Sequence, residues 1–224
     1  MKVDVIATGS TGNVFMFDNI IIDIGVPMKQ LKDKIDFSKI SHIFLTHIHQ
    51  DHFNKTTIRN IITNHKHIKI VYGEWLSEPM RLLRVENFEV IEMNKLYEFG
   101  GFKVAGFFVT HDAPNCGYRL VKDGHKHIHA TDINTLMGIT AQGYDTATIE
   151  CNYHRDTVLD IIESKRERGE FSHLVKALEN HLDVADCVEF CKVNKIKRLI
   201  PVHVGESSRV EVMQYIKDSG VNYA

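Results

Sequence analysis

The chain has 224 residues, of which 43% are hydrophobic and 25% charged, and its formal net charge is −2. This length suits a single domain, residues 1–224, and the composition excludes a disordered chain. The near-neutral charge disfavours a long nucleic-acid footprint. No apolar run approaches the roughly 20 residues of a membrane span, and the four Cys are scattered. We therefore expect a cytoplasmic protein without a membrane partner.

Hydrophobic patterning and turn residues predict the elements in chain order. In the first part we expect strands over residues 3–7, 14–17, 20–24, 43–45 and 68–72, and helices over residues 27–35, 56–65 and 74–84. In the second part we expect strands over residues 88–92, 102–109, 118–121, 125–130, 146–150 and 198–202, and helices over residues 158–168, 184–193 and 209–217. Two batches of strands, each followed by helices, predict an α/β fold with two mixed sheets packed face to face and helices outside.

A dense group of potential metal ligands follows the expected strand over residues 43–45. His47, His49, Asp51 and His52 lie within six positions. Imidazole and carboxylate are good ligands for zinc and related ions, and a loop that follows a short strand can direct several of them to one point. The spacing predicts two ions, because His47 and His49 can bind one while Asp51 and His52 turn toward another.

Two metal ions need further ligands, which we expect at the ends of other strands. His111, Asp132 and His203 each follow an apolar strand. Two other histidine groups have no carboxylate in the same pattern, and we interpret them as solvated faces. They are His65 with His67, and His125 with His127 and His129.

These motifs resemble the metallo-β-lactamase fold family over essentially the whole chain. The HxHxDH signature matches residues 47–52, and Ile22-Asp23-Ile24-Gly25 matches an early Asp of the family. The resemblance implies a four-layer αβ/βα sandwich of two mixed β-sheets. One ion is expected on His47, His49 and His111, and the other on Asp51, His52 and His203. Asp132 is expected to bridge the ions opposite a shared hydroxide, while Asp23 orients the loop without binding metal.

Other segments resemble a compact phosphodiesterase and nuclease branch of this family. They are Gly9-Ser10-Thr11-Gly12-Asn13, Thr110-His111-Asp112-Ala113, Ala130-Thr131-Asp132, Glu150-Cys151-Asn152 and His181-Leu182-Asp183. The branch includes bacterial exonuclease-like proteins and phage anti-Pycsar phosphodiesterases, which hydrolyse cyclic pyrimidine nucleotides. Many members have Ser or Thr at the position of Asp183, which is still expected to cap the following helix.

The resemblance and the residues together predict a dinuclear phosphodiesterase that attacks its substrate with a metal-bound hydroxide. Asp51 and His181 are the expected catalytic residues, with His181 contacting the phosphate or protonating the leaving oxygen. Asn13, Asn152 and His154 are candidates for shaping the substrate site. The weak net charge favours a small phosphodiester, such as a cyclic mononucleotide of the cCMP or cUMP type.

Two other activities use the same ligands. One is an exonuclease-like nuclease acting on DNA or RNA, and the other is a thioester or lactam hydrolase. The residues after the motif, Phe53-Asn54-Lys55, differ from the glycines of glyoxalase-type thioesterases, and a secreted lactamase would need an export signal. Two divalent ions are expected as cofactors, with Zn²⁺ favoured by the histidines and Mn²⁺ as the alternative. A homodimer is compatible with a small-substrate pocket.

Overall fold

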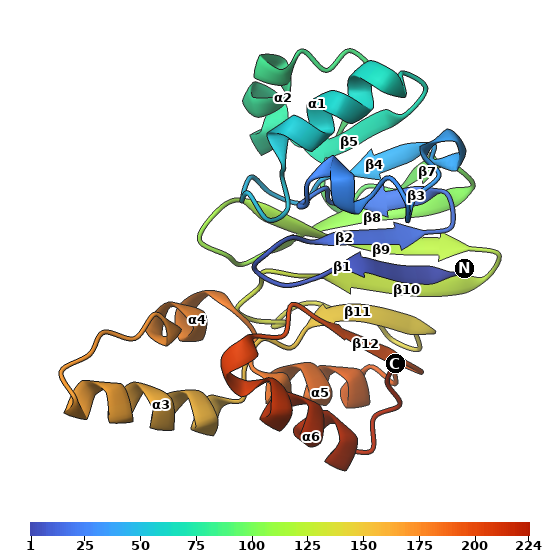
Figure 1. Ribbon diagram of the computed structural model, residues 1–224. Helices are drawn as coiled ribbons and strands as arrows, with labels where there is room; N and C mark the ends of the chain where they lie inside the picture. Colours follow the sequence, from blue (N-terminus) through green and yellow to red (C-terminus); the bar gives the residue numbers. More distant parts are fainter. The chain divides into compact units, whose positions relative to one another are not determined.

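The computed structural model describes residues 1–224, and the chain divides into two compact units. The first unit contains Met1–Phe108 and Ala113–Gly124, and the second contains Val109–Asp112 and His125–Ala224. The strands belong to two six-stranded mixed sheets (Figure 1), which confirms the predicted α/β class. None of the helices is both long and apolar enough to span a bilayer.

The first sheet lies entirely in the first unit and has the strand order β1-β2-β3-β4-β5-β6. Its strands are β1 (Val3–Ala7), β2 (Val14–Phe17), β3 (Ile20–Ile22), β4 (His42–Phe44), β5 (Lys69–Gly73) and β6 (Phe88–Ile91). The first three are antiparallel, whereas β3 to β6 are parallel. The carboxyl ends of the parallel strands therefore share one edge, where loops can bring polar side chains together.

Two helices of the first unit, α1 (Lys55–Asn64) and α2 (Ser77–Leu83), contribute to its core. Ile58 and Ile61 are buried at helical spacing on α1, and Met80 is buried on α2. The side chain of Asn54 caps α1 by accepting a hydrogen bond from the Thr57 amide. This unit also contains β7 (Tyr97–Phe99), most of β8 (Phe102–Val109) and β9 (Asn115–Lys122), all strands of the second sheet.

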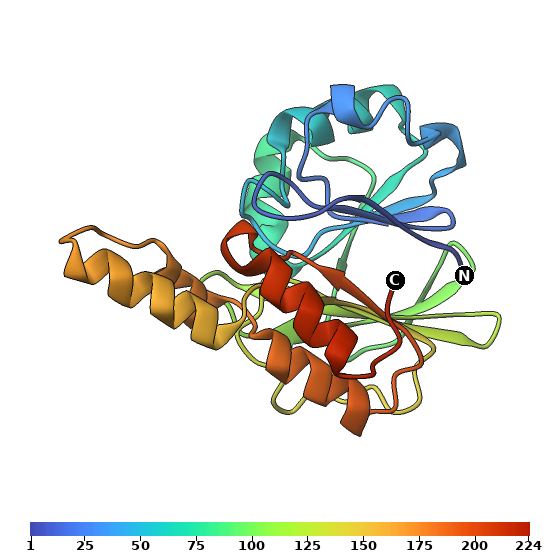
Figure 2. The same ribbon diagram turned by 60° about the horizontal axis from the view of Figure 1, so that its bottom comes forward.

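The second unit contains three parallel strands, β10 (His125–Ala130), β11 (Thr146–Glu150) and β12 (Leu199–Val202). Its helices are α3 (Arg155–Glu167), α4 (Leu174–Asn180), α5 (Val184–Val193) and α6 (Arg209–Asp218). Helices α5 and α6 pack side by side, and α5 contacts β11, whereas α3 and α4 project away from these strands (Figures 1 and 2). Asp183 caps α5 as predicted, because its side chain accepts a hydrogen bond from the Ala185 amide.

Several predicted elements differ in the structure. Residues 27–35 form only the 3-10 turn Met28–Gln30 and irregular turns, so the predicted helix is wrong. The predicted helix over residues 74–84 is a 3-10 turn, Glu74–Leu76, followed by α2. Pro79 explains this break, because it lacks the N–H that a continuous helix would bond to the carbonyl of Trp75. Strand β7 and helix α4 were not predicted.

Candidate functional site

In the first unit the predicted ligand loop follows β4 at the carboxyl edge of the parallel strands. The amides of His52 and Phe53 both donate to the carbonyl of His49, which folds the loop into a tight turn. The turn brings the imidazole of His47 within 4.7 Å of that of His49 and within 4.3 Å of that of His52, measured between ring centroids. Three of the predicted ligands therefore lie together within this unit.

Asp23 determines which nitrogens the rings of this loop present. Asp23 lies directly after β3, its side chain is buried, and its backbone has the left-handed conformation (φ 61°). One of its oxygens, Oδ2, accepts hydrogen bonds from the Thr46 hydroxyl at 2.8 Å and from His52 Nδ1 at 2.6 Å. His52 therefore carries its proton on Nδ1 and presents an unprotonated Nε2, the form in which imidazole binds metal.

Thr46 fixes the protonated nitrogen of His47 in a similar way. Its hydroxyl proton is directed to Asp23, so its oxygen accepts from His47 Nδ1 at 2.9 Å. His47 thus also presents an unprotonated Nε2. The predicted role of Asp23 as a residue that orients the loop remains a prediction, and these contacts are the physical basis for it.

Asn13 joins the Gly-rich turn after β1 to the ligand loop. Its side-chain amide donates to His52 Nε2 at 2.8 Å and to Asp51 Oδ2 at 3.3 Å. Its backbone N–H donates to the carbonyl of Asp51 at 2.7 Å. A Cβ at Gly25 would meet that same carbonyl oxygen at 1.7 Å, so only glycine allows the loop to approach so closely. The structure thus places Asn13 against two predicted ligands.

We expect Asp23→Asn to lower the metal affinity of the protein by about 10- to 100-fold, the usual effect of losing a residue that orients a ligand. The side-chain NH₂ of Asn cannot accept a hydrogen bond from His52 Nδ1, so that ring no longer holds its proton there. Asn tolerates the left-handed backbone, which preserves the fold. Competition with a coloured chelator measures the affinity.

The matched control is Asp18→Asn, because Asp18 is also left-handed (φ 49°) but lies in the turn between β2 and β3 and pairs with Lys122. Its metal affinity should equal that of the unchanged protein. Equal affinities for all three proteins would contradict the role of Asp23.

In the second unit, the ends of four strands carry potential ligands. Three of these residues were predicted, and the fourth is Glu150. His111 follows β8, Asp132 follows β10, and His203 follows β12. Asp132 Oδ1 lies 3.3 Å from His203 Nε2, and its Oδ2 lies 3.8 Å from His111 Nε2. Asp132 (φ 52°) and His203 (φ 51°) are both left-handed, and such strained positions are concentrated at functional sites.

Glu150, at the end of β11, is the residue that sequence reasoning missed. It is completely buried, and its Oε1 accepts from His181 Nδ1 at 2.6 Å and from His203 Nδ1 at 3.0 Å. Burial alone would raise the pKa of Glu150, but the hydrogen bonds from these two rings hold that pKa below its ordinary value. Its position at the end of an apolar strand, like that of Asp132, was the available signal in the sequence.

The contacts of Glu150 fix the two rings in defined orientations. His203 carries its proton on Nδ1 and presents Nε2 toward Asp132. Asp132, Glu150, His181 and His203 form a group whose potential ligand atoms lie within 4.8 Å of one another. Neutral imidazole nitrogens with carboxylate oxygens are a donor set that fits a divalent cation such as zinc.

His111 is similarly prepared, since its Nδ1 donates to the carbonyl of Asn180 at 3.2 Å. Burial lowers the pKa of His111, although Asp132 and Asp112 oppose this effect. A lowered pKa keeps the ring neutral, as metal binding requires.

His181 directly follows α4, and its ring stacks on that of His203 with centroids 5.1 Å apart. Burial lowers the pKa of His181, but its hydrogen bond with Glu150 and the charge of Glu150 outweigh this effect and raise the pKa above its ordinary value. Its side chain is 22% exposed, so a substrate can reach it. The predicted catalytic role of His181 remains a prediction, but the structure places the ring beside two predicted ligands of its own unit.

The other two candidate substrate residues differ in their surroundings. Asn152 donates from its side chain to the carbonyl of His203 at 3.0 Å, so it contacts a predicted ligand. His154 lies at the start of α3, where its ring contacts Thr157 and Tyr215. No contact of His154 with the group around Glu150 is present within this unit. Both roles stay predictions.

One interpretation of the other histidines is wrong. His127 and His129 are completely buried, so β10 does not present a solvated histidine face. The parallel neighbour β11 covers them with Thr146 and Thr148, whose hydroxyls bond to the rings. His67 is exposed and His65 is half-buried, closer to the solvated face that was predicted.

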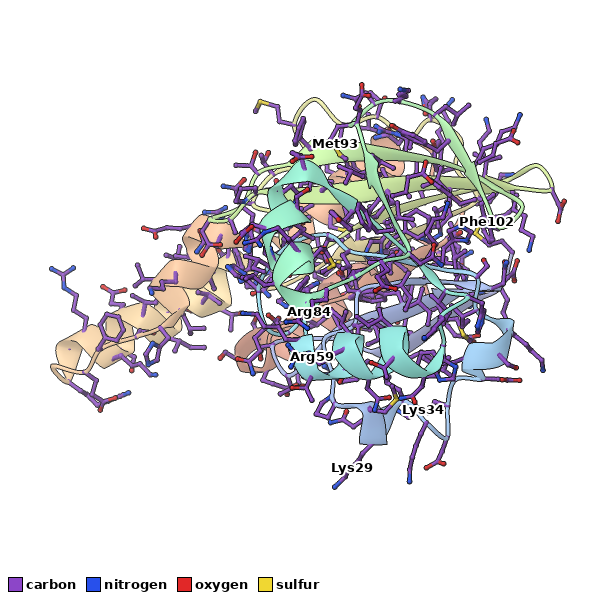
Figure 3. The ribbon with its side chains drawn as sticks, turned by 90° about the horizontal axis from the view of Figure 1, so that it is seen from above. Lys29, Lys34, Arg59, Arg84, Met93 and Phe102 are labelled. Carbon is purple, nitrogen blue, oxygen red and sulfur yellow. The ribbon has the colours of Figure 1, made fainter.

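One cavity of the first unit lies away from the predicted ligands. It has a volume of about 660 Å³, and its lining includes Arg59 on α1 and Arg84 after α2 (Figure 3). Ile68 and Asn87, which precede β5 and β6, also line it. The cavity is therefore at the amino ends of these parallel strands, whereas the ligand loop follows the carboxyl end of β4. We assign it no part in the chemistry.

Comparison with known proteins identifies the fold. The family model described as β-lactamase superfamily domain matches residues 18–204. The metallo-β-lactamase fold protein YhfI from Bacillus subtilis is 14% identical, with a TM-score of 0.79 over 99% of this chain and 93% of that one. A diphosphatase of the PhnP family is 15% identical, with a TM-score of 0.70 over 99% and 94%. The short form of human tRNase Z is 19% identical, with a TM-score of 0.66 over 92% and 93%. No curated protein is detectably similar in sequence.

Proposed function

Because the chain belongs to the β-lactamase superfamily, we propose that it is a metal-dependent phosphodiesterase of small nucleotides, such as cyclic mononucleotides of the cCMP or cUMP type. The observation that carries this proposal is a pair of buried carboxylates. Asp23 in one unit and Glu150 in the other each hold an imidazole through Nδ1 and so keep its Nε2 unprotonated, the form that can bind a metal. In this proposal seven residues bind two divalent ions, Zn²⁺ by preference and Mn²⁺ as the alternative: His47, His49, Asp51, His52, His111, Asp132 and His203.

Two bound cations would lower the pKa of a coordinated water to about 7 and neutralise charge on a phosphate. The chain supplies the remaining functions. His181 donates a hydrogen bond to a phosphate oxygen or a proton to the leaving oxygen, and Glu150 fixes the orientation of its ring. Asp51 is the catalytic carboxylate of the ligand loop, held by Asn13.

A phosphodiester is favoured over a thioester or a lactam for three reasons. A phosphodiester carries a negative charge, which the reacting groups of a thioester and a lactam lack, and His181 can donate a hydrogen bond to that charge. Two proteins of similar fold, the PhnP-family diphosphatase and tRNase Z, have names that refer to phosphate or RNA substrates. The resemblance to the phosphodiesterase and nuclease branch supports the same class, with an exonuclease-like activity on DNA or RNA as the alternative. The net charge of −2 favours the small substrate.

An activity panel on zinc-loaded and manganese-loaded protein tests this function. It contains cyclic mononucleotides, a chromogenic phosphodiester, single- and double-stranded DNA, RNA, a thioester and a lactam. We expect hydrolysis of the cyclic mononucleotides and the chromogenic phosphodiester. Asp51→Ala should abolish that activity, because it removes both a ligand and the catalytic carboxylate.

The other outcomes each overturn a specific part of the proposal. Degradation of DNA or RNA without hydrolysis of cyclic nucleotides would establish the nuclease alternative. Hydrolysis of the lactam or thioester alone would exclude a phosphodiesterase. Activity that Asp51→Ala retains would assign the reaction to a contaminant or to another site.

A further inference from the structure

A ladder of imidazoles and hydroxyls runs between β10 and β11 in the second unit. His125, His127 and His129 alternate along β10, and Thr146 and Thr148 alternate along β11. The parallel register pairs His127 with Thr146 and His129 with Thr148. Side chains two residues apart lie on the same face of a sheet, so the five groups form one row. His127, His129 and Thr148 are completely buried, whereas His125 and Thr146 are half-buried.

Four hydrogen bonds connect this row without a gap. The hydroxyl of Thr146 bonds to His125 Nε2 at 2.9 Å and to His127 Nδ1 at 2.6 Å. The hydroxyl of Thr148 bonds to His127 Nε2 at 2.9 Å and to His129 Nδ1 at 2.7 Å. Each hydroxyl thus joins two rings, and His127 uses both of its nitrogens. The row leads from a half-buried ring to a completely buried one.

When each hydroxyl donates to one of its two rings, the protons of these groups have only two arrangements. Burial lowers the pKa of His127 well below its ordinary value, so this ring is neutral and has a single N–H. A hydroxyl has one proton, so a threonine that donates to one ring accepts from the other. Either every donor points toward His125, or every donor points toward His129. All three rings, when neutral, then carry their protons on Nδ1 in the first case and on Nε2 in the second.

We propose that this ladder is a proton-transfer chain between the half-buried His125 and the end of β10 that leads to Asp132. Starting from the first arrangement, a proton binds His129 Nε2 while His129 Nδ1 gives its proton to Thr148. Thr148 passes its own proton to His127 Nε2, and the same two transfers repeat through Thr146 to His125. His125 Nδ1 then releases a proton to solvent.

Only N–H and O–H bonds form and break in this sequence, and one proton enters for each proton that leaves. The result is the second arrangement, and passage in the opposite direction restores the first. Apolar side chains would fill the same positions without the desolvation cost of buried imidazoles and hydroxyls. What these groups provide, and apolar side chains would not, is an unbroken series of hydrogen bonds from His125 to His129.

The use of this chain in catalysis rests on the proposed function. Hydrolysis of a phosphodiester takes a proton from the attacking water and supplies one to the leaving oxygen. The first transfer would send a proton outward through the ladder and the second would bring one back, which restores the first arrangement for the next turnover. His129 lies three residues before Asp132, the proposed bridging ligand, so the ladder offers a route from that end of the strand to His125.

Nitrogen NMR of ¹⁵N-histidine-labelled, zinc-loaded full-length protein tests the chain directly. In the unchanged protein we expect His125, His127 and His129, when neutral, to share one tautomer. Thr148→Val has the same shape but no hydroxyl, so it should uncouple His129 from His127 and slow exchange of the His129 ring proton with solvent. Thr148→Ser retains a hydroxyl and should restore the behaviour of the unchanged protein.

Thr57→Val is the matched control, because the buried hydroxyl of Thr57 donates to the carbonyl of Val26 in the other unit, outside the ladder. It should leave the tautomers and the exchange of the three rings unchanged. In hydrolysis assays Thr148→Val should lower kcat by a factor of about 10 to 100. General acid–base catalysis typically contributes at least ~10²-fold, and the ladder assists proton transfer only indirectly. Thr57→Val and Thr148→Ser should leave kcat unchanged.

Three results would overturn the proposal: tautomers that differ among the three neutral rings of the unchanged protein, exchange at His129 that Thr148→Val does not slow, or a Thr148→Ser variant as impaired as Thr148→Val. The last would assign the loss to packing. If the unchanged protein hydrolysed no phosphodiester, the proposed function would fail, while the NMR measurements would still decide whether the chain conducts protons.

Discussion

Asp132→Asn is expected to lower kcat/KM for the phosphodiester substrate by about 10³-fold, since metal ions contribute several kcal/mol of charge stabilisation and each 1.4 kcal/mol is a factor of ten. The carboxylate of Asp132 faces both His111 and His203, and an amide in its place lacks the charge that would attract cations to the proposed site. Asn accepts the left-handed backbone at this position, so the fold should persist. Metal analysis of the purified variant should show fewer bound ions per chain.

The control for this variant is Asp123→Asn. Asp123 has nearly the same backbone conformation (φ 50°) but lies in the exposed turn between β9 and β10. The Asp123→Asn variant tests whether an Asp-to-Asn change at a position with left-handed backbone is harmful in itself. We expect the activity and metal content of this variant to equal those of the unchanged protein. Full metal content and activity in Asp132→Asn would remove Asp132 from the proposed ligand set.

Glu150→Gln is expected to lower the free energy of unfolding of the metal-free protein by about 3 kcal/mol, the usual consequence of breaking a buried charged pair. Glu150 accepts hydrogen bonds from His181, His203 and the amide of Ile133. The amide of Gln carries no charge and cannot accept from all three groups. Urea denaturation followed by circular dichroism measures the change.

The same variant should lower the pKa of His181, because Glu150 raises that pKa through its hydrogen bond and its charge. Titration of the ring by NMR measures this shift independently of stability. Glu89→Gln is the control: Glu89 forms a half-buried ion pair with Lys69 at the protein surface, and surface pairs contribute about 0–1 kcal/mol. Equal unfolding free energies for the two variants would show that the Glu150 pair contributes no special stability.

The local elements that differed from prediction show where hydrophobic patterning is insufficient. The helix over residues 27–35 was predicted from Pro27 as its first residue, and Leu31 and Ile35 are buried at helical spacing. Only one such pair anchors this segment, and a short helix cannot offset the cost of its first turn without more tertiary contacts. The division of residues 74–84 was readable in principle from Pro79. Helix α4 has no buried residue, so no apolar stripe revealed it.

The sequence by itself determined the family, the clustering of potential ligands over residues 47–52 and the strand-end positions of His111, Asp132 and His203. These features are local, because each consists of a residue type at a fixed distance from an apolar strand. Only the tertiary structure decided the partners. Glu150 meets His181 and His203 across 31 and 53 positions of the chain, and β11 buries His127 and His129 by pairing with β10. Sheet register creates these contacts, and register depends on which strands become neighbours, which no local pattern records.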